Sequence, residues 1–121
     1  MKEDISTWRK LGCYAQTELG HGSNIAGLET TATLDLQTDE WVIHSPTVTS
    51  TKYWPGSLGR WANHAALFAR CIVGKQDYGV QCFVVQIREY ETHQPCKGVQ
   101  VGDIGPKLGY NSKDNGWLMF D

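Results

Sequence analysis

The residues with the clearest chemical potential lie in a glycine-rich segment near the start of the chain, Gly12 to Asn24. It runs through Thr17-Glu18 into a Gly-His-Gly-Ser turn, where missing side chains let backbone N–H groups approach the oxygen atoms of a ligand. No Gly-Lys-Ser/Thr follows, as a Walker loop requires, and the third glycine of a dinucleotide fingerprint is absent. The residues alone leave two interpretations open, a tight structural turn or a loop that holds a phosphate or cofactor.

A second segment, Lys52 to Gly59, places two large aromatic side chains directly before a Pro-Gly turn. Tyr53 and Trp54 have the shape to fill a core, or to form a flat platform against a planar ring whose edge would meet the Gly56 backbone. A third segment, Gly102 to Tyr110, combines glycine turns with charged residues. Each segment is also compatible with ordinary turn chemistry.

The cysteines and histidines do not indicate a metal site. No Cys-x-x-Cys pair is present, and no two histidines share the i, i+4 spacing of a helical site. We therefore expect no metal and interpret the cysteines as small core or surface residues. These residues are Cys13, Cys71, Cys82 and Cys96, with His21, His44, His64 and His93.

The elements that must position these segments are predicted to be strands, which makes the chain all-β. Alternating or continuous apolar runs separated by turn residues predict a β-barrel or sandwich-like domain, with at most a short helical turn after Glu18. The runs at 65–73 and 80–87 are predicted to be central strands, buried on both faces. The other predicted strands are 30–36 and 41–44, which form a hairpin, 47–53, and 117–120 after the Asn115-Gly116 turn.

Length and composition limit the possible functions. The chain has 121 residues and 13.5 kDa, of which 40% are hydrophobic and 20% charged, which fits one folded domain and excludes intrinsic disorder. A net charge of -2 provides no strong field for nucleic acid or an anionic membrane. No apolar stretch approaches the ~20 residues that a membrane span needs, and the first residues lack a secretory signal pattern, so we expect a reducing compartment.

Five motifs in a fixed order resemble the middle β-domain of the peroxisomal acyl-CoA oxidases. The Tyr-Trp-Pro-Gly motif favours the oxidases, because the wider acyl-CoA dehydrogenase superfamily has Trp, an aliphatic residue and Thr or Ser there. The resemblance covers 12–121 and leaves 1–11 as an N-terminal extension or added sequence. The motifs are Thr17-Glu-Leu-Gly-His-Gly-Ser-Asn24, Glu29–Thr33, Ser45–Lys52, Tyr53–Gly56 and Gly102–Lys107.

The resemblance implies an FAD enzyme that oxidises fatty acyl-CoA to trans-2-enoyl-CoA in fatty acid β-oxidation and reduces O2 to H2O2. Thr17 would hydrogen-bond the isoalloxazine, Gly56 would offer its backbone to the flavin edge, and Ser23 would contact acyl-CoA. The catalytic glutamate belongs to a C-terminal helical domain, so no catalytic residue is expected in this chain, which would be inactive alone. The implied partners are fatty acyl-CoA, O2, the helical domains of the same oxidase and a second subunit in a peroxisomal homodimer.

Two alternatives remain at this point. One is an acyl-CoA dehydrogenase domain that delivers electrons to a carrier flavoprotein instead of O2. The other is a non-enzymatic β-barrel binding module, suggested by five Trp and five Tyr residues.

Overall fold

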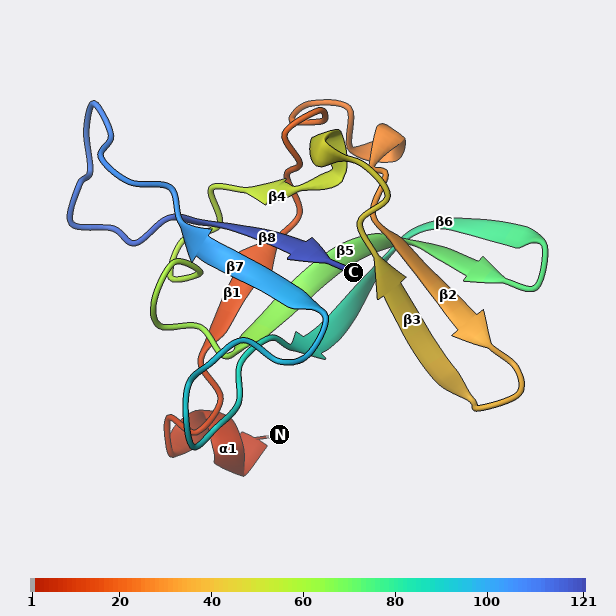
Figure 1. Cartoon of the computed structure of the whole chain (residues 1–121), viewed down its shortest axis with the longest axis horizontal. Helices are drawn as coiled ribbons and strands as arrows, with labels where there is room; N and C mark the ends of the chain where they lie inside the picture. Colours follow the sequence, from red (N-terminus) through yellow and green to blue (C-terminus); the bar gives the residue numbers. More distant parts are fainter. Residues whose placement is uncertain (1) are drawn as a thin grey trace.

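The computed structural model describes residues 2–121 and consists mostly of β-strands (Figure 1). Helical structure in these residues is limited to one short α-helix and two 3-10 turns, η1 and η2. None of the described helices is long and apolar enough to cross a membrane. The elements are α1 (Lys2–Ser6), β1 (Gly12–Ala15), η1 (Ile25–Gly27), β2 (Thr31–Asp35), β3 (Glu40–His44), η2 (Val48–Ser50), β4 (Lys52–Tyr53), β5 (His64–Val73), β6 (Gln76–Gln86), β7 (Val99–Asp103) and β8 (Gly116–Phe120).

Strand β5 organises the larger, five-stranded sheet. On one edge it pairs with β6 in a long antiparallel hairpin. Its other edge pairs in parallel with two strands in succession, β1 along His64–Leu67 and then β2 along Arg70–Val73. The chain must therefore leave this edge after β1 and return to it at β2. The segment between these strands, residues 16–30, is called the excursion here, and it carries the Gly-His-Gly-Ser turn.

A smaller sheet with the order β4-β8-β7 covers part of the first sheet, and Figure 1 shows β7 and β8 crossing in front of β1 and β5. Leu118 and Phe120 of β8 belong to the same buried cluster as Ala15 of β1 and Leu67 of β5. Burying these apolar side chains together is the main force that holds the two sheets against each other.

The mostly-strand expectation is confirmed. The 30–36/41–44 hairpin is present as β2 and β3, the run at 65–73 is the central strand β5, and the strand expected at 117–120 is β8. The turn expected at Asn115-Gly116 was wrong, because Asn115 lies in irregular backbone and Gly116 is already the first residue of β8. The expected turn after Glu18 is the 3-10 turn η1, whereas α1 and η2 were not expected. Neither sheet closes on itself in residues 2–121, so the barrel-like or sandwich-like detail stays a prediction.

Two strand predictions were wrong in part. Only Lys52 and Tyr53 of the segment 47–53 form a strand, because the Thr47 and Ser50 side chains make a capping box that turns the backbone into η2. All but the last residue of the run at 80–87 falls in β6, which pairs only with β5 within residues 2–121 and leaves Val84 62% exposed. An apolar run indicates a preference for strand geometry, but it does not say how many neighbours the strand has.

Candidate functional site

The first two glycine-rich segments lie side by side, although they are far apart in the sequence. The backbone N–H of Tyr53 donates to the carbonyl oxygen of Thr17 over 3.0 Å. Glu18 and Lys52, the adjoining residues, form an isolated antiparallel β-bridge. The start of the excursion after β1 is therefore joined to β4, and Thr17 is brought next to the aromatic pair.

A small hollow of about 140 Å³ opens where these two segments meet. The Thr17 hydroxyl makes no hydrogen bond within residues 2–121, so it is free to serve a ligand. Trp54 is 55% exposed at the hollow, and the Tyr14 ring there packs at 4.9 Å from Phe68. The lining residues are Tyr14, Gln16, Thr17, Tyr53, Trp54 and Pro55.

The turn after Tyr53 has a strained backbone. Trp54 (φ 67°) and Ser57 (φ 68°) both adopt left-handed conformations, which cost non-glycine residues roughly 1–3 kcal/mol each. The start of β8 holds the turn, because the Trp54 N–H donates to the Gly116 carbonyl, and the Gly116 N–H donates to the Pro55 carbonyl. Only glycine fits at position 116, since a Cβ there would lie 2.6 Å from the Gly59 nitrogen.

Gly56 presents its backbone beside the hollow. Its N–H donates no hydrogen bond within the described residues, and Gly56 itself is half-buried. A Cβ at this position would lie 2.5 Å from Cε of Lys113, whose Nζ donates to Oγ of Ser57 over 2.7 Å. The absence of a side chain therefore leaves room for Lys113 to cross the turn.

Ser23 lies apart from the hollow. It is exposed in the excursion, where its carbonyl accepts from the Ile25 N–H, and it does not line the hollow. The structure thus brings Thr17 and the Pro55-Gly56 turn together, but not Ser23. A contact between Ser23 and acyl-CoA stays a prediction.

A buried ion pair joins the base of the excursion to β4. Glu18 Oε1 accepts from Lys52 Nζ over 2.9 Å and from the Thr30 hydroxyl over 2.6 Å, while Oε2 accepts from the Glu29 N–H over 2.8 Å. Burial by itself raises the pKa of Glu18, but these donors together lower it below its ordinary value. Burial lowers the pKa of Lys52, and Glu18 opposes that shift.

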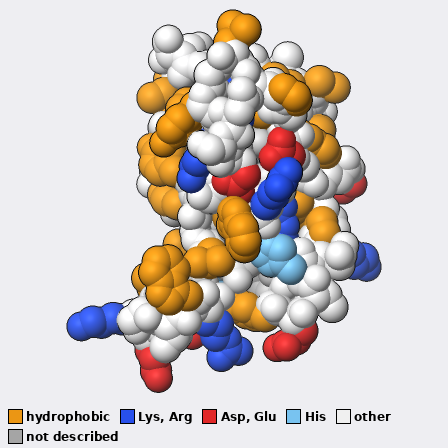
Figure 2. Space-filling model, turned by 90° about the vertical axis from the view of Figure 1, so that its left-hand side faces the viewer, with side chains coloured by type: hydrophobic (Ala, Val, Ile, Leu, Met, Phe, Trp, Pro, Cys, Tyr) orange, Lys and Arg blue, Asp and Glu red, His pale blue; other side chains and the backbone are white. Residues whose placement is uncertain are grey.

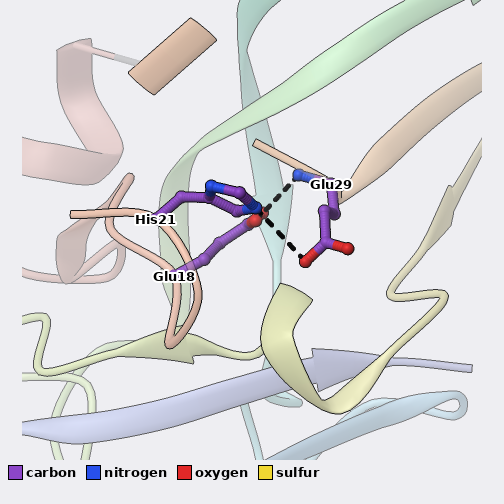
Figure 3. A group of neighbouring side chains, drawn as sticks. All are labelled: Glu18, His21 and Glu29. Carbon is purple, nitrogen blue, oxygen red and sulfur yellow. Dashed lines mark hydrogen bonds and ion pairs between the residues drawn. The ribbon is translucent and has the colours of Figure 1, made fainter. Parts of the chain in front are cut away.

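Glu18, His21 and Glu29 gather at this point, as Figure 3 shows. Their potential ligand atoms all lie within 4.8 Å of one another, and Nε2 of His21 is 3.5 Å from Oε2 of Glu29. A divalent cation is not favoured here, because both Glu18 oxygens already accept hydrogen bonds and the Lys52 ammonium would repel it. The cluster fixes the excursion rather than offering a metal site.

A larger hollow of about 570 Å³ lies by the 104–115 loop. Figure 2 shows basic and acidic side chains close together on the face where Figure 1 places this loop. The hollow is lined by three basic residues, Arg60, Lys107 and Lys113, and by the acidic residues Asp103 and Asp114, so the two signs of charge largely offset each other.

Sequence reasoning missed three residues that hold the site in place, namely Lys52, Lys113 and Asn115. Lys52 was visible as a charged residue directly before two aromatics in a strand-like segment. The positions of Lys113 and Asn115 beside the 54–57 turn depend on the pairing of β4 with β8, which no local pattern indicates.

The family described as acyl-CoA dehydrogenase, middle domain, matches residues 13–121. The chain is 60% identical over 114 residues to peroxisomal acyl-coenzyme A oxidase 1 of Arabidopsis thaliana, and 55% identical over 111 residues to the Homo sapiens protein of that name. Each match covers 92% of this chain and 17% of the relative, so the chain spans about a sixth of the length of these relatives.

Solved structures give the same result. The fold matches Arabidopsis thaliana acyl-CoA oxidase 1 with a TM-score of 0.96 and 56% identity, over 99% of this chain and 19% of that one. It also matches Caenorhabditis elegans acyl-CoA oxidase-2, described as bound with FAD, ascaroside-CoA and ATP, with a TM-score of 0.95 and 50% identity. That match covers 98% of this chain and 18% of the other.

Proposed function

Because the chain belongs to the family of acyl-CoA dehydrogenase middle domains, we propose that it forms one wall of the flavin site of a peroxisomal acyl-CoA oxidase. The observation that carries this proposal is the hollow between Thr17 and Pro55, with a free hydroxyl on one side and the free Gly56 N–H beside it. Both groups are donors suited to the polar edge of an isoalloxazine.

The size of the hollow fits a wall rather than a complete site. Pockets that bury most of a small-molecule ligand or cofactor measure roughly 300–1,000 Å³, whereas this hollow is about 140 Å³. Residues from the rest of the oxidase, including its helical domains, would close the site. Within the chain, the domain would comprise residues 12–121, preceded by the extension 1–11.

FAD, when bound, would accept the hydride that leaves the β-carbon of a fatty acyl-CoA as trans-2-enoyl-CoA forms, and O2 would then be reduced to H2O2. The Thr17 hydroxyl and the Gly56 N–H would donate to the ring and stabilise negative charge on it. Trp54 would exclude water from one face of the isoalloxazine ring. Ser23 would contact acyl-CoA. The base that removes the α-proton would come from outside this chain, in the same subunit of a homodimer.

The test uses the full-length polypeptide that carries this chain. Thr17→Val should weaken FAD binding about tenfold, as expected for one lost hydrogen bond to a ligand, and should lower peroxide production from a fatty acyl-CoA. Thr17→Ser keeps the hydroxyl and should bind FAD nearly as well. Thr38→Val, an exposed position in the β2–β3 turn, is the control and should change neither.

Unchanged FAD affinity in Thr17→Val would overturn the placement of the flavin. Slow reoxidation of the full-length protein in air, with fast transfer to a carrier flavoprotein, would point to a dehydrogenase instead. Peroxide production by the isolated 121 residues would contradict a base outside the chain.

A further inference from the structure

Three consecutive residues of the excursion, Gln16, Thr17 and Glu18, are each hydrogen-bonded to the dipeptide Lys52–Tyr53. Lys52 Nζ donates to the Gln16 carbonyl over 3.0 Å and to Glu18 Oε1 over 2.9 Å. Between these contacts, the Tyr53 N–H donates to the Thr17 carbonyl over 3.0 Å. One lysine thus holds the backbone carbonyl of the residue before Thr17 and the side-chain carboxylate of the residue after it.

We infer that Lys52 is a positioning residue for the flavin site, which fixes the Thr17 hydroxyl in the hollow by holding the Gln16 carbonyl before it and the Glu18 carboxylate after it. This inference rests on the proposed function, because it concerns the same site. Lys52 itself is fully buried and does not line the hollow, so it acts through Thr17 rather than on a ligand.

The third contact of Lys52 explains why a buried cation is placed here. Its Nζ donates to the Phe68 carbonyl of β5 over 2.7 Å. On this edge of β5, pairing with β1 ends at Leu67 and pairing with β2 begins at Arg70, so Phe68 falls in the gap that the excursion leaves. Lys52 supplies the donor that the interrupted ladder lacks and anchors the excursion to the central strand.

The three contacts also fix the protonation state of Lys52. The three acceptors, Gln16 O, Glu18 Oε1 and Phe68 O, use all three N–H bonds of an ammonium group, whereas a neutral amine has two. Buried ion pairs contribute little net stability relative to well-packed apolar residues. Placing the Gln16 carbonyl and the Glu18 carboxylate on either side of Thr17 gives Lys52 a role in addition to any stabilising one.

The experiment compares Lys52→Met, Thr17→Val and the double variant in the full-length polypeptide. FAD affinity is measured by flavin fluorescence at a temperature where circular dichroism shows every variant folded. If Lys52 acts through Thr17, Lys52→Met should weaken FAD binding about five- to tenfold. The double variant should then be no weaker than Thr17→Val alone, which is a non-additive result.

Ile87→Ala is the control for a purely structural effect, because Ile87 is fully buried in the core and does not line the hollow. It should lower the unfolding temperature while leaving FAD affinity within about twofold. If Ile87→Ala weakens FAD binding as much as Lys52→Met does at a matched loss of unfolding temperature, Lys52 is only structural and the inference fails.

The remaining outcomes separate this inference from the proposed function. No effect of Thr17→Val on FAD affinity would overturn the proposed function, and the positioning role would fall with it. An effect of Thr17→Val with no effect of Lys52→Met, or with additive losses, would overturn the inference alone. If the methionine variant does not fold, Lys52→Gln retains N–H donors on a shorter, uncharged side chain, and the same non-additivity is required of it.

Discussion

The side-chain amide of Asn115 donates a 2.7 Å hydrogen bond to the carbonyl oxygen of Trp54, across 61 residues of sequence. Trp54 has a positive φ of 67°, so this contact supports a conformation that a tryptophan rarely adopts. Asn115→Ala should destabilise the domain by about 1–2 kcal/mol, because the carbonyl loses its donor and the turn loses support. Urea denaturation of the 121-residue chain measures the change. Asn24→Ala, at an exposed position without a capping hydrogen bond, should stay within about 0.5 kcal/mol.

Glu18 should make the fold sensitive to acid. Its pKa is lowered from an ordinary 4.5, because its hydrogen-bond donors and Lys52 outweigh the opposing effect of burial. A depressed carboxyl pKa stabilises the fold above the unfolded value, and that stability is lost as the pH falls through the folded value. The free energy of unfolding should therefore decline as the pH drops below 4.5. Glu18→Gln should flatten this decline, whereas Glu40→Gln, at an exposed position, should leave it unchanged.

The two cysteines Cys13 and Cys82 should differ sharply toward alkylating reagents. Cys13 is buried, and burial raises the pKa of its thiol to about 11, so almost no thiolate is present at pH 8. Cys82 is exposed on β6. Iodoacetamide followed by mass spectrometry should modify Cys82 within minutes and Cys13 only after unfolding. Equal rates for both in the native protein would show that β1 opens readily.

Arg88 should be essential for the segment that follows the Pro55-Gly56 turn. Its guanidinium is buried and donates to the carbonyls of Leu58, Gly59 and Ala62. Arg88→Met leaves these three acceptors without a donor and should cost about 2–4 kcal/mol in urea denaturation. Arg70→Met, at a half-buried position, should cost less. An Arg88→Met variant as stable as the parent would mean that water replaces the guanidinium.

The proposed function places Gly56 where it should control access of O2 to a flavin in the full-length protein. We expect Gly56→Thr to slow reoxidation several-fold, because the added side chain would displace Lys113 and narrow the space beside the turn. Stopped-flow absorbance of the reduced protein mixed with air-saturated buffer measures the rate. Gly109→Thr, where a Cβ would meet nothing within 4 Å, is the matched control. Equal reoxidation rates in the two variants would contradict an O2 path at Gly56.

Local sequence patterns predicted those parts of the fold that depend on nearby residues. The β2–β3 hairpin and the final strand β8 follow from strand propensity and turn chemistry within a few positions. The parallel pairing of β1 and β2 with one edge of β5 joins distant segments and leaves no periodic signal. For the same reason, the sequence did not predict the role of Lys52, because that role depends on a gap in the pairing of β5 at Phe68.

The candidate site was predicted in composition but not in geometry. Thr17 and Gly56 were named from a family resemblance, and the structure places Thr17 at a hollow lined by Tyr53, Trp54 and Pro55. Glycine and aromatic residues alone were equally consistent with turns and core packing. The contact between Thr17 and Tyr53 could not be predicted from the sequence, because it depends on where β4 lies relative to β1.

Strands β1 and β2 precede β5 in the chain, so neither can complete its parallel ladder while the protein is still being synthesised up to residue 63. Contacts between distant segments form slowly, because loop closure must come first. The β2–β3 hairpin is able to form earlier, since its strands are neighbours in sequence. We therefore expect the stretch around Thr17 to reach its final place only after β5 has been synthesised, and the neighbouring strand β4 only after β8. Until both strands have been made, this stretch is open to proteases and chaperones, and the hollow beside it is incomplete.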